Sequence, residues 1–413
     1  MATYADITRL DSILKDRPIM DAIQDAINKA TPLAEKITQK LTLSGRKGIF
    51  PVQFGVNEGI GARADRGTLP ASSVDSPSLA EVYAKFLYAR FDISGPVMSA
   101  TRDSPGAFQE ALSLQLENTV DGVKLDMARQ LLNASANGVI ALVNAKVSTT
   151  SARIDSPFGL TTYVSDGVVK NLLRPNMAIN VIDTDGSTVN VGTSTISSVT
   201  HTDGSYTTLV YGTAETNAVA DGDYVVRDGS FGYELQGFFN AVATSGTYMN
   251  ISRTGQPGWQ GVVTACGGGS AVDLTPDMLR DEVDAIMEQT GEIPDLIVCN
   301  YKQRRNIYNL YAPQIRYAPM VLPGGLRENT LSFDDIDIIA ERFFPPEHIG
   351  FVNTKYWYHA IDKDVEWIQG QTGTALHFTL TADVFEAVLR TYRNMVCLYP
   401  ATSGYIYQID EAY

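Results

Sequence analysis

The chain has 413 residues, of which 44% are hydrophobic and 19% are charged, and its formal net charge is -15. This composition suits a soluble protein with a sizeable core, and the length suggests two or three domains. The acidic excess argues against a protein that grips nucleic acid tightly, because such binding needs lysine and arginine to neutralise phosphates. With no signal-peptide layout and no run of ~18 uncharged apolar residues, we expect a protein made in the cytoplasm and not held in a membrane.

The cysteines and histidines predict no metal site and no cofactor. The cysteines are far apart and odd in number, which argues against a disulfide framework and a zinc site and favours buried free thiols: Cys266, Cys299 and Cys397. The histidines are equally scattered: His201, His348, His359 and His377. No catalytic motif or phosphate-binding loop occurs. One enzyme hypothesis stays open, a metal-dependent hydrolase that uses His359 with Asp362 or Asp364.

Residues 1–47 predict an N-terminal arm, and residues 48–103 an extended loop. The arm has apolar residues at helical spacing, interrupted at Pro32, but too few of them to close a core: Ile19, Ile23 and Ile27. In the loop, an alternating, glycine-punctuated run is followed by the polar stretch 64–78 and by a second apolar run. This pattern predicts a long two-stranded ribbon, which is only marginally stable by itself and therefore indicates assembly. An ordinary hairpin folded back on its own domain remains the alternative.

Residues 104–154 contain the clearest helical pattern. Ser104 suits the N-cap and Pro105 the first helical position. Apolar positions then recur every three or four residues as far as Leu131, so residues 104–133 predict a helix of ~45 Å. Gly122 in its interior costs about 1 kcal/mol relative to alanine, and a close backbone contact would explain a glycine there.

Residues 155–230 predict an inserted β-rich module. Short alternating runs such as MAINVID, STISSVT and YTTLVYG are separated by DTDG, HTDG and DGD turns, the pattern of a small β-barrel or sandwich. The module has nine acidic residues against three basic ones, which indicates a solvent-facing unit.

Residues 231–332 show an α/β pattern, and residues 333–413 are mainly strands. Thr275 and Pro276 open a predicted helix that Gly291 closes; a buried strand at Leu296–Cys299 and a second helix at Tyr301–Tyr311 follow. Arg304 and Arg305 on the second helix could touch phosphate, although a solvated face or an interface pair is commoner on an acidic protein. The closing strands should form a sheet packed on the long helix, in an α+β layer.

The order of these elements resembles that of tailed-bacteriophage major capsid proteins of the Hong Kong 97 type. Three stretches resemble the spine helix, the axial region and the closing strands of that family: FQEALSLQLENTVDGVKLDMARQLLNAS, LTPDMLRDEVDAIMEQTGEIPDLIVCNYKQRRNIYNLY and FEAVLRTYRNMVCLYPATSGYIYQI. The resemblance covers nearly the whole chain apart from 155–230. It implies an α+β fold with an N-terminal arm, an extended loop, a spine helix, axial and peripheral domains, and the β-module as an insertion.

The resemblance implies a structural protein and no enzyme. Copies would form hexamers and pentamers of an icosahedral phage head, enclosing double-stranded DNA without sequence-specific binding. A scaffolding protein, a portal and a decoration protein are the implied partners, and the virion is the implied location. At the loop tip we predict inter-subunit contacts by charged residues: Arg63, Asp65, Arg66 and Asp75. The rival hypothesis is an encapsulin-type nanocompartment shell, which would hold an enzyme in place of DNA.

Overall fold

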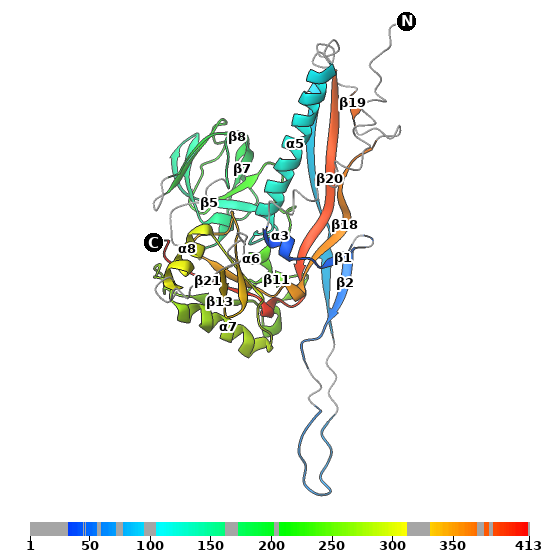
Figure 1. The fold of residues 1–413 in the computed structure, drawn as a ribbon, viewed down its shortest axis with the longest axis vertical. Helices are drawn as coiled ribbons and strands as arrows, with labels where there is room; N and C mark the ends of the chain where they lie inside the picture. Colours follow the sequence, from blue (N-terminus) through cyan, green and yellow to red (C-terminus); the bar gives the residue numbers. More distant parts are fainter. Residues whose placement is uncertain are drawn as a thin grey trace, which may run out of the picture.

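The computed structural model describes residues 32–43, 45, 47–55, 59–71, 77–94, 105–161, 172–201, 206–311, 331–369, 376–379 and 383–411. The arm residues Ile19, Ile23 and Ile27 and the loop residue Asp75 therefore lie outside the described residues. Figure 1 shows a long helix and a long sheet side by side, with a β-barrel and a second sheet to one side of them and a hairpin that projects beyond both.

The elongated layer consists of one helix on one sheet. The helix α5 (Pro105–Gln130) covers a sheet of β1 (Lys40–Thr42), β18 (Trp357–Trp367), β20 (Val384–Cys397), β19 (His377–Thr379) and β4 (Lys85–Ser94). Apolar side chains spaced along α5 are buried against inward-facing residues of the sheet: Leu116, Val120, Val123 and Met127 against Phe91, Ile93, Val365, Trp367 and Leu389. The predicted packing of a sheet on the long helix is confirmed.

The β-module is a closed barrel, one of the two predicted architectures. Its strands run in the order β10 (Tyr224–Arg227), β5 (Val139–Ser148), β6 (Ser151–Asp155), β9 (Thr207–Tyr211), β8 (Val189–His201) and β7 (Ala178–Ile182). The barrel therefore begins at Val139 and not at residue 155. The reason is that β5 and β6 form a tight hairpin, and each pairs on its other edge with a strand from later in the chain.

The axial part is a six-stranded sheet in the order β13 (Val262–Ala265), β21 (Gly404–Tyr407), β17 (Ile349–Val352), β14 (Leu296–Cys299), β16 (Ile336–Ala340) and β15 (Leu331–Phe333). The helices α7 (Pro276–Thr290) and α8 (Tyr301–Tyr311) pack on the same face of this sheet. The hydroxyl of Thr275 accepts a hydrogen bond from the Met278 N–H, and Gly291 ends α7 with a φ of 73°. The predicted bounds of α7, β14 and α8 match the structure.

Short elements join these parts. They are α3 (Pro32–Lys36), β2 (Lys47–Val52), β3 (Ser78–Tyr83), α6 (Phe238–Ala241), β11 (Thr247–Tyr248) and β12 (Ile251–Ser252), with single turns at Pro157–Gly159, Pro257–Trp259, Thr354–Tyr356 and Pro400–Thr402. Pro32, expected to interrupt a helix, begins α3, where its missing N–H costs no hydrogen bond. None of the helices in the described chain has both the length and the apolarity needed to span a membrane.

Candidate assembly surfaces

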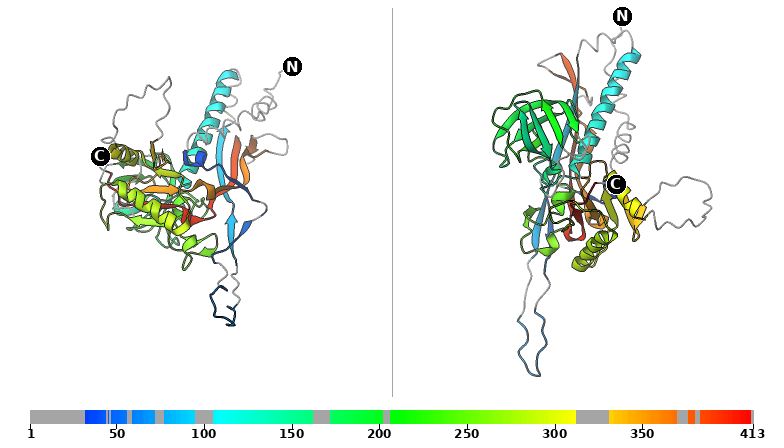
Figure 2. Two further views of the ribbon diagram at one scale, coloured as in Figure 1. Left: turned by 60° about the horizontal axis from the view of Figure 1, so that its bottom comes forward. Right: turned by 90° about the vertical axis from the view of Figure 1, so that its left-hand side faces the viewer.

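The hairpin of β2 and β3 projects from the body of the molecule (Figures 1 and 2). Its antiparallel ladder pairs Lys47 with Tyr83 near the body and Val52 with Ser78 at the far end. Beyond that pair, residues 53–55, 59–71 and 77 continue without a strand partner in the described part of the chain. An isolated two-stranded ribbon is only marginally stable in water. A limb that reaches this far from a core therefore needs another surface to stabilise it.

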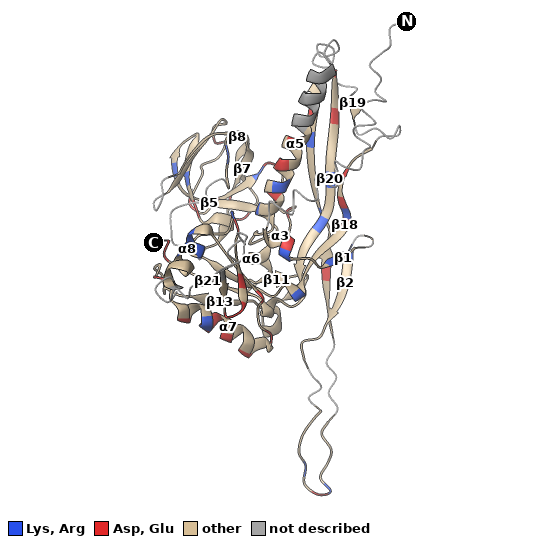
Figure 3. Ribbon diagram, in the orientation of Figure 1, with Lys and Arg blue, Asp and Glu red and all other residues tan. Residues whose placement is uncertain are grey.

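The turn at the end of the hairpin holds three of the four predicted contact residues. Arg63, Asp65 and Arg66 are exposed there (Figure 3). The Nε of Arg63 donates to the Thr68 carbonyl at 2.9 Å, so Arg63 stiffens the turn of its own chain. Asp65 and Arg66 form no ion pair with any other described residue and remain available to a neighbour. Asp75, the fourth predicted residue, lies outside the described residues.

Two aliphatic side chains near the tip were missed by the sequence reasoning. Ile60 is 78% exposed and Leu69 is 82% exposed, one on each limb of the loop. Burying such a side chain stabilises a protein by about 1.5–3 kcal/mol. A neighbouring surface that covered both side chains would therefore gain this free energy twice. A signal was present in the sequence, because they are the only large aliphatic residues in the otherwise small and polar stretch 59–71.

The paired part of the hairpin and Phe54 just beyond it, by contrast, are fixed to the body. Val82 is fully buried, and the Phe54 ring meets the Trp259 ring edge-on with centroids 5.6 Å apart. Lys47 and Glu81 pair across the ladder at 2.6 Å, and the hydrogen bond from Lys47 lowers the pKa of Glu81 below its ordinary value. The hairpin thus leaves the body in a defined direction, and only its outer part lacks support.

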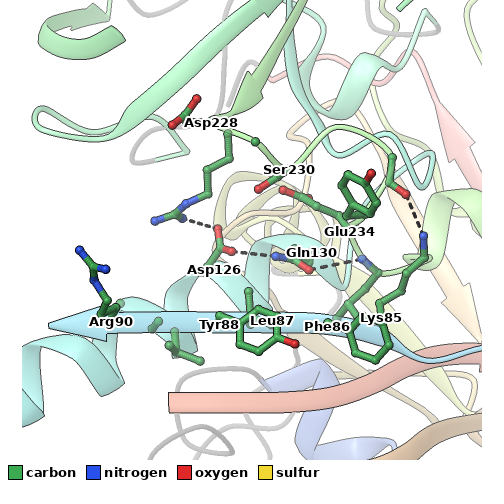
Figure 4. A pocket seen from close by; sticks show the side chains of 18 of the residues that line it. Lys85, Phe86, Leu87, Tyr88, Arg90, Asp126, Gln130, Asp228, Ser230 and Glu234 are labelled. Carbon is green, nitrogen blue, oxygen red and sulfur yellow. Dashed lines mark hydrogen bonds and ion pairs between the residues drawn. The ribbon is translucent and has the colours of Figure 1, made fainter. Parts of the chain in front are cut away.

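A groove of about 840 Å³ lies between β4, α5 and the segment that follows the barrel (Figure 4). The exposed aromatic side chains of Phe86, Tyr88 and Tyr233 contribute to its lining. Gly122 faces it from α5, and a Cβ at that glycine would have no atom within 4 Å. The close backbone contact that would explain Gly122 is therefore absent from the described structure, because the helix borders open space there.

The groove also borders an unpaired edge of the long sheet. In the described part of the chain, β4 pairs only with β20, through a ten-residue antiparallel register from Lys85–Arg393 to Ser94–Val384. In Figure 4 the groove lies on the side of β4 away from β20. The backbone N–H and C=O groups on that edge can pair with an added strand, so the groove suits an extended segment with apolar side chains.

Known proteins resemble the chain in both sequence and fold. Residues 208–364 match the family of the SU10 major capsid protein. The fold is similar to the cyanophage A-1(L) capsid asymmetric unit, with a TM-score of 0.56 and 10% identity over 92% of this chain and 93% of that one. The chain has the fold of a tailed-phage major capsid protein. The capsid role is structural and not enzymatic, since the family match spans the end of the barrel and most of the axial part of this capsid fold.

Two other capsid-type shells resemble this major capsid fold more loosely. The capsid of the native GTA particle gives a TM-score of 0.48 at 10% identity, covering 91% of this chain and 89% of that one. The holo-SrpI encapsulin complex from Synechococcus elongatus PCC 7942 gives 0.42 at 10% identity, covering 93% and 90%. No curated protein sequence matches the chain.

Buried charges fix the barrel to the spine helix α5. Arg129 on α5 contacts Asp126 at 3.1 Å and Glu234 at 2.5 Å, and Arg227 at the end of β10 reaches Asp126 at 2.6 Å. Burial would raise the pKa of Asp126, but Arg129 and Arg227 outweigh it and hold the pKa below its ordinary value. Gln130 adds a hydrogen bond to the same carboxylate at 2.7 Å. Asp126, Gln130, Arg227 and Glu234 of this network also line the groove (Figure 4).

Two residues of the hydrolase hypothesis, His359 and Asp364, have structural contacts, and the third, Asp362, is exposed. Asp364 pairs with Arg393 at 2.6 Å, and His359 Nε2 lies 3.4 Å from the Ala34 carbonyl oxygen. Among the described residues, no three histidine, cysteine, aspartate or glutamate side chains are grouped so that they could hold a metal ion. His348 is fully buried, and burial lowers its pKa to about 3. These contacts join strands and the N-terminal segment, and they suit a structural protein.

Proposed function

We propose that copies of this chain assemble into hexamers and pentamers that tile an icosahedral phage head around double-stranded DNA. The observation that carries the proposal is the outer half of the hairpin, which exposes Ile60 and Leu69 and has no strand partner in the described chain. Such a limb gains its partner only from another copy. Because the hairpin and the surface that receives it are different parts of the subunit, the contact is head-to-tail, and repeated contacts of that kind close into rings.

The groove beside β4 is the proposed receiving surface. Its open edge offers backbone hydrogen-bond partners to an extended limb, and Phe86, Tyr88 and Tyr233 offer an apolar lining to the aliphatic side chains of that limb. Gly122 leaves room between limb and helix. Backbone hydrogen bonds between the limb and β4 of the neighbouring copy would set the register of the two strands. Burial of Ile60 and Leu69 would supply most of the binding free energy.

The charged residues of the tip have a smaller proposed role. Asp65, Arg66 and Asp75 would pair with charges of the neighbour, while Arg63 holds the turn. Exposed ion pairs contribute about 0–1 kcal/mol each, so they would orient the limb and add little affinity.

The remaining assignments follow from the same proposal. The chain would divide into an arm (1–47), an extended loop (48–103), the spine helix and the start of the peripheral domain (104–154, which also contributes the first barrel strands), the rest of the β-module (155–230), the axial domain (231–332) and the closing strands (333–413). The barrel would be a separate outward module and a candidate contact for a decoration protein. A scaffolding protein and a portal would take part in assembly, which would occur in the host cytoplasm.

The test compares a tip variant with a matched control. Ile60→Ser with Leu69→Ser should lower the yield of particles at least tenfold, because losing about 3 kcal/mol per contact weakens it by about two orders of magnitude. Val147→Ser with Val189→Ser removes two exposed aliphatic side chains from the barrel and should leave the yield unchanged. Electron microscopy and sedimentation measure assembly, and circular dichroism checks folding. Normal particles from the folded tip variant would contradict the proposal.

The contents of the particles decide between a phage head and a nanocompartment. Nuclease-protected double-stranded DNA in particles isolated from infected cells is the expected result. Particles that hold an enzyme and no protected DNA would favour the encapsulin-type alternative.

A further inference from the structure

The exposed face of α8 carries two aromatic side chains with two basic ones between them. Four residues at the spacing i, i+3, i+4 and i+7 share this face, here called the Tyr–Arg stripe: Tyr301, Arg304, Arg305 and Tyr308. On the opposite face, Gln303 and Ile307 are fully buried. The Arg304 guanidinium lies over the Tyr301 ring, 5.7 Å from its centroid, so aromatic and charged groups form one continuous surface.

The exposed face of α7 has the opposite charge. Four carboxylates follow one another along it, here called the acidic stripe: Asp277, Asp281, Asp284 and Glu288. The buried face of α7 packs Leu279 and Ile286 on the axial sheet. Within the described residues these four carboxylates form no ion pair. The arginine beside the stripe, Arg280, is directed to Asp334 of its own chain at 3.6 Å.

The two stripes are placed where neighbours in a ring would meet. In Figures 1 and 2, α7 lies on the side of the axial part toward which the hairpin points, whereas α8 lies farther from the hairpin. Figure 3 shows the red bands along α7 and the blue bands at α8. Suppose that the hairpin of one copy reaches over the next copy. The side of the first copy that bears the hairpin and α7 then faces the side of the second copy that lies away from its own hairpin. The same displacement brings α7 toward the neighbour's α8.

We propose that the acidic stripe of α7 docks on the Tyr–Arg stripe of α8 in the next copy of this chain. The inference rests on the proposed assembly into rings and names a second, separate contact of that ring. A head-to-tail interface joins one surface of a subunit to a different surface of the next subunit. Two helices of opposite charge on one chain meet that requirement. On a protein of net charge -15, a basic stripe is the rarer feature, and the partner's carboxylates neutralise it.

The side chains of the two stripes suit a contact that is repeated between successive copies in a ring. Arginine binds carboxylates through two parallel hydrogen bonds, and the tyrosine rings beside it exclude water and strengthen the pairs. One exposed pair is weak, but the contacts act together around a closed ring. The other possible occupant of the Tyr–Arg stripe is the phosphate backbone of packaged DNA, which the experiment below distinguishes.

Charge reversal on each side, followed by reversal on both, tests the docking. Arg304→Glu with Arg305→Glu places two carboxylates against the four of the acidic stripe, and Asp281→Lys with Asp284→Lys places two lysines against the two arginines of the Tyr–Arg stripe. Each double variant should assemble at least tenfold less than the unmodified chain. The quadruple variant, in which the charges have changed sides, should recover to within about threefold of it. Asp185→Lys with Asp221→Lys makes the same charge change on barrel turns and should assemble normally.

Particle yield is measured by sedimentation and electron microscopy, with a thermal melt of each unassembled variant as the folding control. Folded double variants that assemble normally, or a quadruple variant that is not rescued, would overturn the inference. Normal particles that lose protected DNA only in the Arg304→Glu/Arg305→Glu variant would assign the stripe to nucleic acid and overturn it as well. If the unmodified chain forms no particles, it is the proposed function that fails.

Discussion

Replacing the buried carboxyl group of Glu282 with an amide should remove a large pH dependence from the stability of the subunit. Glu282 lies on the buried side of α7 and is 1% exposed. The backbone of β21 packs directly on it, since a Cβ at Gly404 would lie 2.6 Å from Oε1. Burial raises the pKa of Glu282 from 4.5 to about 7, and the nearby Thr264 hydroxyl lowers it only in part.

The size and sign of the effect follow from that shift. The unfolded chain releases this proton near pH 4.5, whereas the folded chain keeps it to about pH 7. Between those values the folded state binds more protons, so its stability falls as the pH rises, by ~1.4 kcal/mol per unit. Between pH 4.5 and about pH 7 the loss approaches ~3 kcal/mol, and it is complete by about pH 8. In Glu282→Gln this loss is absent.

Urea unfolding of unassembled subunits between about pH 5 and pH 8 measures the effect. The amide has its own unpaired polar atoms, so the informative quantity is the change with pH and not the absolute free energy. Glu288→Gln, on the exposed face of the same helix, should keep the pH dependence of the unmodified chain. Parallel pH profiles for Glu282→Gln and the unmodified chain would refute the reasoning.

Three further substitutions probe the subunit itself through its unfolding free energy. Arg129→Met should cost about 3–5 kcal/mol, because it leaves Asp126 and Glu234 buried without their shared cation; a loss below about 1 kcal/mol in urea unfolding would contradict this. Gly122→Ala should add about 0.5–1 kcal/mol, since the new methyl group meets no atom within 4 Å; a lower melting temperature would be the opposite result. Thr275→Ala should cost about 1 kcal/mol by removing the N-cap of α7, and Thr275→Ser, which keeps the hydroxyl, should restore most of it.

The sequence predicted elements whose signals are local. Thr275 and Pro276 open α7 and Gly291 closes it, because capping depends on hydrogen bonds within one helical turn. The bounds of β14 and α8 were equally readable, since each has a short, strongly patterned run between turn residues. The order of the elements then gave the capsid fold.

Features that depend on distant partners were not readable from the sequence. The apolar pattern of β5 does not reveal that β10, some eighty residues later, completes its barrel. The pairing of Asp126 with Arg227 joins residues 101 positions apart, and neither position stands out in the sequence. For the same reason a close contact was the explanation offered for Gly122, where the structure has open space, because composition cannot show what lies beside a helix.

The described structure separates the parts that hold the subunit together from the parts proposed to join subunits. The barrel, the spine helix and the connecting segment are held by buried charges and apolar clusters that include neither residues 59–71 nor the exposed stripes of α7 and α8. A ring of five and a ring of six require the same surfaces to meet at slightly different angles. A limb rooted at Val82 but unsupported at Ile60 can adjust its direction, and long charged side chains can adjust their pairing, while a rigid body cannot. The body of the subunit can therefore stay rigid, because the hairpin limb and the charged stripes adjust to the different angles between neighbours.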